Sequence, residues 1–471
     1  MRHDPSAGPP PSDSAAAPAP PALSPHTQRL LQEPAVLLLL RLSWPNILIM
    51  LAQASTGLVE TWWLSHLGTD ALAGMALVFP AVMMMQMIAG GAMGGGISSA
   101  IARALGAGRR ADADALVLHA VLINLGIGLV FSAVMLTFGR PIYAALGGEG
   151  GALDAALRYS NVVFAGNLFL WVMNALSSVI RGTGNMIVPG LVICVGALLL
   201  VPLSPLLIFG LGPLPGLGIA GGGVALVLYY VCGTLFLGWY VLSGRNLARL
   251  HRARLQWPLF RDILRVGAVA AITSVQTNLT IALSTGLVGE AAGVDAVAGF
   301  GTGARLEYLL VPLVFGIGGP LVALVGTNIG AGQRERAMHI ALVGAGITFA
   351  MAETIGLAAA LWPAAWLGLF SQDAGMIETG STYLRIVGPA YGFFGLGMAF
   401  YFGSQGAGRL FWPLVAGFLR VLVAIGGGWL ALRLTGSLTA LFAALAAGLV
   451  VYGLVLAVAV RSGVWFHRRA R

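Results

Sequence analysis

The stretch Arg181-Gly182-Thr183-Gly184-Asn185, followed by Pro189, returns in altered form as Gln405-Gly406-Ala407-Gly408-Arg409, followed by Pro413. The first glycines are 224 positions apart (406 − 182), and so are the second glycines and the prolines. Further out, residues 105–109 (LGAGR) return at the same offset as residues 329–333 (IGAGQ), and residues 70–74 (DALAG) return 225 positions later as residues 295–299 (DAVAG). Markers in one order at one spacing indicate a duplicated unit. Gly-x-Gly before a proline is typical of a tight turn, so we expect these loops to be turns that do not contact a substrate.

The composition places the chain in a membrane. Hydrophobic residues make up 58% and charged residues 9% of the 471 residues, with a mean hydropathy of +0.88. A soluble protein needs roughly 25% charged residues. Cys194 and Cys232 lie in apolar runs, which favours buried small side chains over a disulfide or a metal site, and no cofactor is predicted. Duplicated halves in so apolar a chain favour a transporter whose two lobes move about a shared cavity.

Apolar stretches long enough to span a bilayer, which takes about 20 residues, occur six times in each half. The predicted spans are 43–65, 71–100, 113–138, 153–180, 187–209, 217–243, 262–288, 296–327, 337–361, 380–403, 411–434 and 437–460. The fold prediction is therefore an all-α integral membrane protein of 12 transmembrane helices in two six-helix bundles. The predicted parts are a disordered cytoplasmic tail (1–35, rich in Pro, Ala and Ser), an N-lobe (36–243), a cytoplasmic linker (244–261), a C-lobe (262–460) and a basic cytoplasmic tail (461–471).

The arginines predict the orientation. If the amino terminus is cytoplasmic, 20 of the 26 basic residues fall on cytoplasmic segments, four on external ones, and Arg305 and Arg420 inside spans. This bias follows the positive-inside rule, so the basic run 245–265 is a topology signal and no nucleic-acid partner is predicted, with contact to anionic lipid as the minor alternative. Because six spans is an even number, both halves enter from the cytoplasm, both termini are cytoplasmic, and the repeats are parallel.

Short motifs follow one another along both halves. The first half carries Trp44-Pro45, Val59-Glu60-Thr61, residues 65–68 (SHLG), residues 70–74, residues 102–108 (ARALGAG) and the turn at 181–185; the second carries residues 303–307 (GARLE), residues 325–332 (VGTNIGAG) and the turn at 405–408. This ordered and doubled set resembles the multidrug and toxic compound extrusion (MATE) family over about residues 40–460. The resemblance implies two six-helix bundles around a V-shaped cavity. It also implies efflux of organic, often cationic, compounds driven by inward movement of H⁺ or Na⁺.

Ionisable residues inside the spans are candidates for function, because a charge at the bilayer centre costs about 2.5–3.5 kcal/mol on insertion scales. Glu60 is the first candidate for ion coupling: it stands where the family pattern has an aspartate, and apolar surroundings favour the protonated carboxyl. An ionised Glu60 could instead hold Na⁺, or its carboxylate could simply bond a neighbouring helix. Arg305 and Glu307 are further coupling candidates that do not share a helix face, and an ion pair with another helix is the structural alternative for each. Glu353 and Arg420 could pair across helices.

The sequence departs from the family pattern at three acidic positions. Residues 274–278 (SVQTN) and 391–395 (YGFFG) lack the acids that many relatives carry in spans seven and ten, and Leu200 and Ser204 stand where one branch has Asn-x-x-x-Asp. These vacancies direct the coupling prediction to Glu60 or to the Arg305 and Glu307 positions, and H⁺ is favoured over Na⁺ as the coupling ion.

The cavity wall is expected to hold the remaining polar and aromatic residues of the spans, since cationic drugs favour aromatic faces. The candidates are Gln53, Asn167, Trp171 and Asn174 in the first lobe and Gln276, Asn278 and Tyr308 in the second. Most of the 15 methionines, such as residues 83–85 and Met87, are expected to contact lipid or the core. Methionines that face the cavity would suit loose selectivity.

The sequence thus predicts a monomeric antiporter of a bacterial inner membrane that exports small organic compounds, cationic ones in particular, in exchange for H⁺ or Na⁺. It is not predicted to be an enzyme, because the spans show no nucleophile–base set and no cluster of metal ligands. The alternative is a flippase for a lipid-linked precursor. A flippase would need several arginines for a pyrophosphate, and Arg305 and Arg420 lining an open cavity would favour it.

Overall fold

The computed structural model describes residues 23–211 and 214–466, without the side chains of residues 53–61, 65, 211, 214, 294, 295 and 308. This part of the chain is helical except for loops and a hairpin of two-residue strands, β1 (Gly210–Leu211) and β2 (Leu214–Pro215). Eleven helices are long and apolar enough to cross a membrane, and a bent pair that passes the same test together makes a twelfth span. The predicted all-α fold with 12 spans is confirmed.

The helices of the N-lobe are α2 (Ala35–Ser65), α3 (Thr69–Gln86), the π-helical η1 (Met87–Met93), α4 (Gly94–Gly106), α5 (Arg110–Ala145), α6 (Gly150–Ala165), α7 (Asn167–Gly182), α8 (Ile187–Phe209) and α9 (Ile219–Leu242). Those of the C-lobe are α10 (Trp257–Gly330), α11 (Arg334–Leu361), α12 (Pro363–Leu367), α13 (Ala374–Val387), η2 (Gly388–Ala390), α14 (Tyr391–Gly406), α15 (Phe411–Val421), η3 (Leu422–Gly427), α16 (Gly428–Thr435) and α17 (Leu438–Arg461). Helices α3, η1 and α4 form one span, α6 and α7 are bent by 49°, and α10 holds two spans because Gly293 (φ 78°) breaks it.

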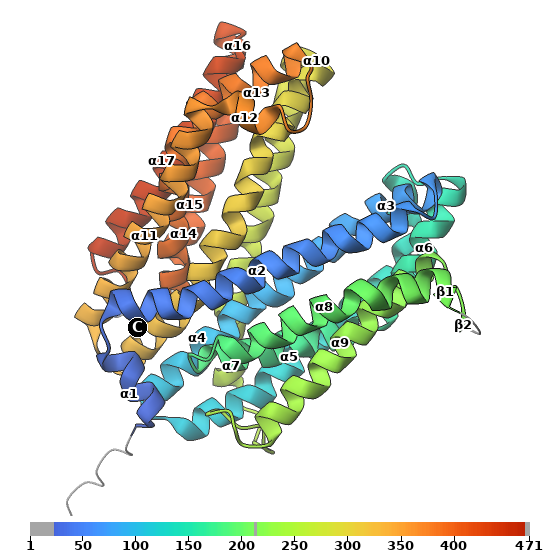
Figure 1. The fold of residues 1–471 in the computed structure, drawn as a ribbon. Helices are drawn as coiled ribbons and strands as arrows, with labels where there is room; N and C mark the ends of the chain where they lie inside the picture. The colour runs from blue at the N-terminus through green and yellow to red at the C-terminus, as the bar shows by residue number, and fades with distance from the viewer. Residues whose placement is uncertain (1–22, 212–213, 467–471) are drawn as a thin grey trace, which may run out of the picture.

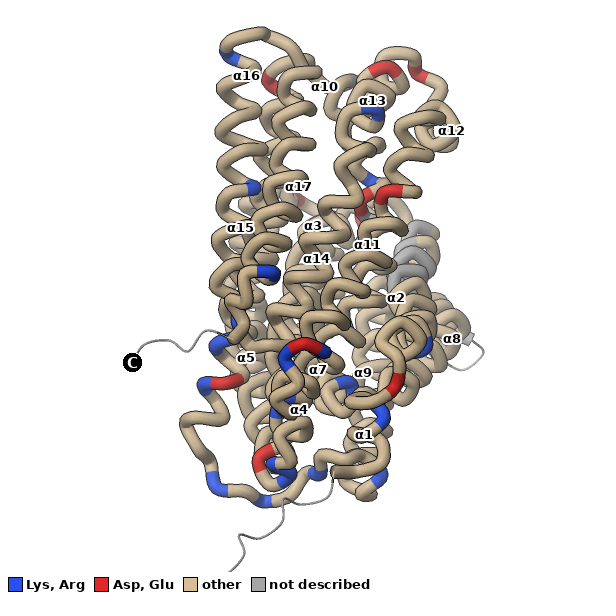
Figure 2. The backbone as a smooth tube through the Cα atoms, turned by 90° about the vertical axis from the view of Figure 1, so that its left-hand side faces the viewer, with Lys and Arg blue, Asp and Glu red and all other residues tan. Residues whose placement is uncertain are grey.

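The two bundles form a V (Figure 1). They meet near α1 and α4, and they diverge toward α3 and α6 in one lobe and toward α13 and α16 in the other. We call the end where they meet the base. Arginines gather at the base, around α1, the turn between α4 and α5, and the segment before α10 (Figure 2).

The first helix of each lobe starts packed against the hydrophobic core of the other lobe. Leu39, near the start of α2, is fully buried in a hydrophobic cluster made mostly of C-lobe residues such as Leu321. Ile263, near the start of α10, is fully buried in the N-lobe cluster, which also holds Ile97. Leu39 and Ile263 are 224 positions apart (263 − 39), within one residue of the offset of 225 in this part of the chain, so the exchange of first helices follows the repeat.

The base shows the repeat as a reciprocal contact. A Cβ atom added to Gly106 would clash with the carbonyl oxygen of Thr327, and one added to Gly330 would clash with that of Arg103. Gly106 and Gly330 are 224 positions apart, and so are Arg103 and Thr327. Helix α4 of one lobe and the end of α10 in the other therefore approach each other through the same residues on both sides, which only glycine permits.

The repeat also holds inside the lobes. An added Cβ at Gly74 would lie 2.8 Å from the Ala156 nitrogen, and one at Gly299 would lie 3.0 Å from the Gly380 nitrogen. The glycines are 225 positions apart and their neighbours are 224 apart. The offset falls from 225 to 224 between Gly74 and Gly106, the interval that contains η1, because a π-helical turn accommodates one extra residue. The glycine-rich residues 90–96 thus serve both close helix approach and this local insertion.

Two predicted boundaries are wrong. Residues 25–32 form helix α1 (Pro25–Gln32) instead of belonging to a disordered tail; the Ser24 side chain caps it, and Leu30 and Leu31 are buried. The predicted linker 244–261 is also too long, because α10 begins at Trp257. In each case apolar residues in a polar or proline-rich segment reach a packed contact, Leu30 and Leu31 in α1 and Leu259 and Phe260 in the first turn of α10, which the composition of these segments does not reveal.

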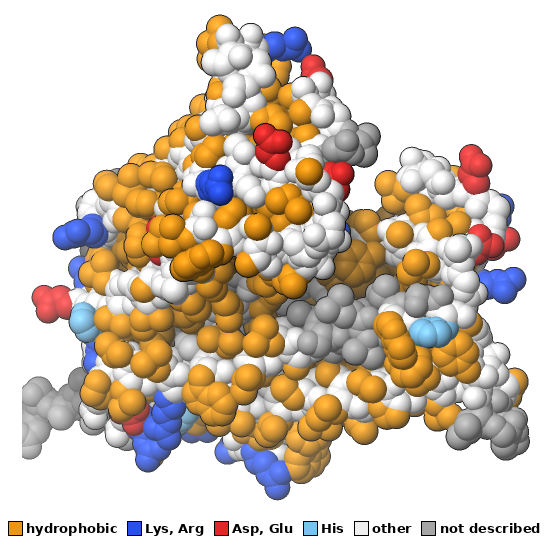
Figure 3. Space-filling model, turned by 45° about the horizontal axis from the view of Figure 1, so that its top comes forward, with side chains coloured by type: hydrophobic (Ala, Val, Ile, Leu, Met, Phe, Trp, Pro, Cys, Tyr) orange, Lys and Arg blue, Asp and Glu red, His pale blue; other side chains and the backbone are white. Residues whose placement is uncertain are grey.

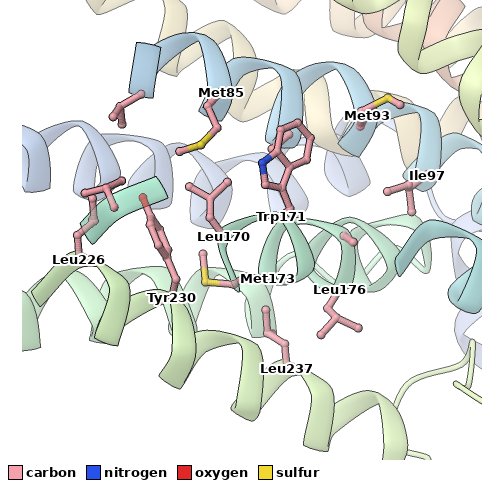
Figure 4. Packing of buried hydrophobic residues seen from close by; sticks show 14 of the residues in the cluster. Met85, Met93, Ile97, Leu170, Trp171, Met173, Leu176, Leu226, Tyr230 and Leu237 are labelled. Atoms are coloured by element: carbon pink, nitrogen blue, oxygen red, sulfur yellow. The ribbon is translucent and has the colours of Figure 1, made fainter. Parts of the chain in front are cut away.

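The interior of the N-lobe is packed by apolar side chains from three helices. Met85 from α3, Leu170 and Met173 from α7, and Leu226 and Tyr230 from α9 project toward one another (Figure 4). One edge of this core opens into the space between the lobes, where the candidate site lies.

Candidate functional site

A cavity of about 820 Å³ lies between the N-lobe helices α3, α7, α8 and α9 and the C-lobe helices α10 and α14. Its wall is mostly apolar and includes Phe79 from the N-lobe and Phe315 and Phe402 from the C-lobe. Seen from the splayed side, the molecule is hollowed between the lobes, and hydrophobic side chains show in the recess (Figure 3). The size and the apolar wall are typical of sites for small organic molecules.

A few polar groups interrupt this wall. They include Gln86, Asn174, Arg181, Tyr229, Tyr230 and Ser274. The Gln86 amide Nε2 donates to the Tyr230 hydroxyl at 3.3 Å, and the Asn174 amide Nδ2 donates to the Leu170 carbonyl at 3.0 Å. Few polar groups in an apolar cavity orient a ligand without holding its whole surface.

Arg181 lines the cavity, although the sequence placed it in a cytoplasmic turn that does not contact substrate. It lies in the last turn of α7 and carries the only formal charge among the described residues of the cavity wall. Its Nε atom is buried without a hydrogen-bond partner, and it forms no ion pair within the described residues. Arg181 therefore belongs both to the end of α7 and to the cavity wall.

The predicted cavity residues of the N-lobe have separate locations. Asn174 lines the cavity. Asn167 is fully buried and donates to the Gly128 carbonyl at 3.2 Å, so it joins α7 to α5. Trp171 is also fully buried, with its ring 5.6 Å from that of Phe131. The Gln53 side chain lies outside the described residues.

The predicted cavity residues of the C-lobe are not among the described residues of this cavity wall. Gln276 is buried against Gly417 of α15, and both polar atoms of its amide lack partners. Asn278 is exposed; its amide donates to the Ser274 carbonyl at 2.9 Å and reaches the Met87 sulfur at 3.9 Å across the lobes. The Tyr308 side chain lies outside the described residues.

Several methionines face the cavity. Met75, Met83, Met87 and Met173 line it, whereas Met85 is fully buried in the core. The wall is therefore flexible and polarisable, which suits ligands of varied shape.

Glu307 contacts a tyrosine of a neighbouring helix. The Tyr383 hydroxyl of α13 donates to Glu307 Oε1 at 2.7 Å, and the buried Tyr391 lies close enough to interact electrostatically with the carboxylate. Glu307 stands one turn before Val311, which lines the cavity on the same helix. A carboxylate hydrogen-bonded to a tyrosine thus lies one turn from the candidate substrate site.

The other candidate charges have different surroundings. The Arg305 side chain is exposed, with its guanidinium carbon 5.9 Å from the centre of the Phe370 ring. The Glu60 side chain lies outside the described residues, although its backbone is part of α2. Among the described residues, no group of three or more His, Cys, Asp or Glu side chains could hold a metal ion.

Glu353 and Arg420 do not pair with each other. Glu353 Oε2 accepts a hydrogen bond from the Gly392 nitrogen at 2.8 Å. The Arg420 guanidinium carbon lies 5.6 Å from the ring centre of Phe394 and 5.8 Å from that of Tyr452. The suggested pairing is wrong, because each charge is compensated by the helix packed against it.

Polar bonds between the lobes close the base below the cavity. Arg103 of α4 forms an ion pair with Asp262 at 2.8 Å and donates to the Gly406 carbonyl of α14 at 3.0 Å. Asn46 of α2 donates to the Gly316 carbonyl at 2.9 Å, and Gln405 donates to the Gly91 carbonyl at 3.4 Å. These bonds would break if the base opened.

A sequence model of the MatE family matches residues 45–206 and 270–430. The chain belongs to the MatE family. The two matches begin 225 positions apart (270 − 45) and end 224 apart (430 − 206), so each half of this MatE protein matches the family model separately. The predicted resemblance and the predicted duplication are both confirmed.

Curated relatives span most of the chain. The FAD transporter of Shewanella oneidensis is 28% identical over 376 residues, which cover 79% of this MatE chain and 82% of that protein. The probable multidrug resistance protein NorM of Thermotoga maritima is 26% identical over 389 residues, covering 82% and 83%. These similarities identify the protein as a multi-pass membrane transporter of small molecules.

Solved structures show the same fold. A MOP superfamily transporter from Pyrococcus furiosus matches with a TM-score of 0.86 at 23% identity, covering 95% of this chain and all of that one. An outward-facing multidrug resistance MATE transporter matches with a TM-score of 0.85 at 24% identity, covering 94% and 98%.

Sequence reasoning missed the cavity residues Arg181, Gln86 and Tyr229. A signal for Arg181 was present in the repeat itself, because the equivalent position is the neutral Gln405. A charge found in only one of two matching turns is not required to form the turn. No comparable signal marks Gln86 or Tyr229.

Proposed function

We propose that this MatE protein is a secondary antiporter that exports organic compounds across a bacterial cytoplasmic membrane by alternating access, driven by H⁺ entry. The observation that carries the proposal is the cavity of about 820 Å³ between two lobes that touch at the base and diverge at the other end. Such a molecule has a site that would face the opposite side of the membrane if the base opened and the other ends closed.

The orientation follows from the arginines at the base (Figure 2). By the positive-inside rule the base faces the cytoplasm, so the cavity of this conformation opens outward and both termini lie inside. We propose a monomer surrounded by lipid as the working unit, because the two lobes of one chain together form the described wall of the cavity. No enzymatic step is part of the proposal.

Glu307 is the proposed site of proton coupling, with Glu60 as a second candidate. The Glu307 carboxylate meets the Tyr383 hydroxyl, one turn from the cavity wall at Val311. A carboxylate held by a hydroxyl gains and loses a proton without further ligands, whereas a cation needs several oxygen ligands around it. This favours H⁺ over Na⁺.

The relatives bear on the exported compounds. The FAD transporter of Shewanella oneidensis and the NorM protein of Thermotoga maritima share the architecture but are named for different cargoes. We infer that this protein exports organic molecules with aromatic or apolar bodies, which the phenylalanines and methionines of the cavity would contact. The prediction of cationic cargo receives no support from the described wall, whose one formal charge is positive.

Export by purified protein in liposomes tests the proposal. A pH gradient in sodium-free buffer should drive uptake of ethidium, or of FAD, into inside-out proteoliposomes. Glu307→Gln should abolish gradient-driven transport and keep expression and thermal stability, and Tyr383→Phe should reduce it. Glu60→Gln tests the second candidate in the same assay.

The matched control is Glu378→Gln, which removes an exposed carboxylate from α13. It should transport like the wild type. Transport that continues at the wild-type rate in both Glu307→Gln and Glu60→Gln would remove these carboxylates from coupling. A requirement for sodium at fixed pH gradient would reverse the choice of ion.

The alternative of a lipid-linked precursor flippase calls for several arginines around a pyrophosphate, and Arg181 is the one arginine among the described residues of the cavity wall. Neither Arg305 nor Arg420 is among the described residues of the cavity wall. The antiporter remains the better proposal.

A further inference from the structure

Arg181 is an uncompensated charge in an apolar cavity. Its guanidinium lies at the end of α7, where the cavity also meets Tyr229 of α9 and Asn174 of α7. The described wall contains no Asp or Glu, and no described side chain or carbonyl accepts a hydrogen bond from Arg181. A half-buried guanidinium without a partner is costly, and such a group calls for a counter-ion.

Another arginine that contacts both lobes, Arg103, is compensated. Arg103 pairs with Asp262 at 2.8 Å and donates to the Gly406 carbonyl at 3.0 Å. The fold therefore supplies partners for a charge that serves the contact between the lobes. It supplies none for Arg181, although both residues lie in the last turn of their helix.

The turn after Arg181 does not need the charge. The equivalent turn of the second half has Gln405, which is buried and donates to the Gly91 carbonyl at 3.4 Å. Gly182 and Gly406 take the same place in the repeat, against the Ser98 and Val322 carbonyls. Because the same turn forms with a neutral side chain, the positive charge has a purpose outside the turn.

We propose that Arg181 is the anion-binding subsite of the cavity and that it holds a phosphate group of an otherwise aromatic or apolar ligand. The inference rests on the proposed function, and it names the substrate class for that cavity. The planar guanidinium donates through several N–H groups, which matches phosphate oxygens. The Tyr229 hydroxyl lies within electrostatic range of Arg181, so one tetrahedral phosphate would meet donors from two helices.

The rest of the cavity fits the other part of such a ligand. Phe79, Phe315 and Phe402 supply aromatic faces, and the methionines supply adaptable contacts. A volume of about 820 Å³ exceeds the space that a phosphate alone would need. The phosphate could belong to a soluble aromatic phosphate ester or to the headgroup of a lipid, and the two sources share this chemistry.

Paired probes that differ by the phosphate test the subsite. Riboflavin and FMN share a ring system, and FMN adds one phosphate; farnesol and farnesyl diphosphate form the corresponding lipid pair. Equilibrium dialysis with the purified full-length protein in detergent gives the affinity ratio within each pair, without any ion gradient. The variants are Arg181→Gln, which introduces the residue of the second repeat, and Arg181→Lys, which keeps the charge.

The wild type should bind the phosphorylated member of at least one pair about tenfold or more tightly than its neutral member, which corresponds to about 1.4 kcal/mol or more. Arg181→Gln should bring that ratio close to one and leave the affinity for the neutral member unchanged, which also shows that the cavity is intact. Arg181→Lys should keep part of the preference. The control Arg385→Gln removes an exposed arginine of α13 and should keep the wild-type ratio.

The pair that shows the effect identifies the source of the phosphate. Ratios near one for both pairs in the wild type, or ratios that Arg181→Gln leaves unchanged, would overturn the subsite. If phosphate binding depends on Arg181 but the protein shows no gradient-driven export, the subsite is supported and only the antiport proposal is refuted. Export of ethidium with no dependence of phosphate binding on Arg181 would leave antiport standing and refute the subsite.

Discussion

Closure of the base depends on glycines that face the other lobe, and an added methyl group there should open it. In Gly330→Ala the new Cβ would lie 2.9 Å from the Arg103 carbonyl carbon and 3.0 Å from the Ala107 nitrogen. In Gly106→Ala it would lie 2.8 Å from the Thr327 carbonyl carbon. Ordinary van der Waals contact begins at 3.4 Å, so the backbones must separate by at least about 0.6 Å (3.4 − 2.8).

The energetic consequence follows from the rigidity of the contact. Both obstructing groups are backbone atoms of helices, so they cannot yield by rotating a side chain. Overpacking of this kind costs typically 1–3 kcal/mol. The cost falls on the conformation with a closed base, and a shift of that size changes its population by about 5- to 150-fold relative to an open base. Because the two glycines are equivalent in the repeat, both variants should have similar effects.

Labelling of a buried cysteine at the base measures the shift. Thr327 is buried at the base against Gly106 of the other lobe, and its hydroxyl donates to the Ala323 carbonyl of its own helix. Thr327→Cys in a background of Cys194→Ser and Cys232→Ser is therefore a reporter. Its rate of reaction with a maleimide should rise about 5- to 150-fold with Gly330→Ala. The matched control is Gly346→Ala on α11, where an added Cβ meets nothing within 4 Å. The control should leave labelling unchanged, while the better helix propensity of alanine adds about 0.5–1 kcal/mol of stability.

Refutation is direct in this design. Equal labelling rates in Gly330→Ala, Gly106→Ala and Gly346→Ala would show that the base does not close through these glycines. A lowered melting temperature without faster labelling would mean that the methyl group destabilises the whole fold instead of one conformation. Opposite effects of the two base variants would contradict the equivalence of the two contacts.

Three more outcomes are expected. Arg103→Gln removes the charged hydrogen bond to the Gly406 carbonyl, worth about 1.5–3 kcal/mol, together with the ion pair to the partly exposed Asp262, which adds little, and should speed labelling of the same reporter about tenfold or more; an unchanged rate would exclude a locking role. Glu353→Ala leaves the Gly392 N–H without its acceptor and should destabilise the protein by about 1–3 kcal/mol in thermal unfolding, whereas Glu353→Gln keeps an acceptor and should be milder. Partial burial lowers the pKa of His26 below 6.5, so released α1 binds more protons, and docking of α1 is strongest above pH 6.5 and weakens as the pH falls through it. Hydrogen exchange of residues 25–32, corrected for intrinsic rates, should show this small effect, and His26→Gln should abolish it.

Much of the fold could be predicted because the repeated motifs and the hydropathy pattern give the same answer independently. The two turns at residues 181–185 and 405–409 and their fixed offset predict the repeat, and hydropathy predicts the 12 spans. Even the irregularity has a sequence signal, since the offset changes from 225 to 224 where η1 (Met87–Met93) lies. Helix α1 was missed because proline and alanine dominate its surroundings, whereas the helix is held by the Ser24 cap, by the burial of Leu30 and Leu31, and by the hydrogen bond from Asn328 to the Leu30 carbonyl.

The candidate site was less predictable because hydropathy does not report which way a polar side chain points. Asn167, Trp171 and Asn174 lie within two turns of the same helix. Asn167 and Trp171 are buried in the lobe, and of the three only Asn174 lines the cavity. The positive-inside rule counted Arg181 as a loop charge, because the rule weighs position along the chain and not the direction of the side chain, which lines the cavity from the last turn of α7.

The residues proposed to bind the phosphate and the proton, Arg181 and Glu307, differ from the residues at the equivalent positions of the other half. Arg181 stands opposite Gln405 at the offset of 224, and Glu307, which precedes the region matching η1, stands opposite the apolar Val82 at the offset of 225. The glycines that close the base, by contrast, match in both halves. A symmetric contact suits a hinge between two similar lobes, because both lobes make the same backbone contacts there. Coupled transport needs different residues in the two lobes, so that protonation of a carboxylate in one lobe changes the affinity of the other lobe for the ligand. Arg181→Gln, which gives both turns the same neutral residue, should therefore preserve the fold and the base while it removes the anion preference of the cavity, a result that the phosphate pairs above would measure.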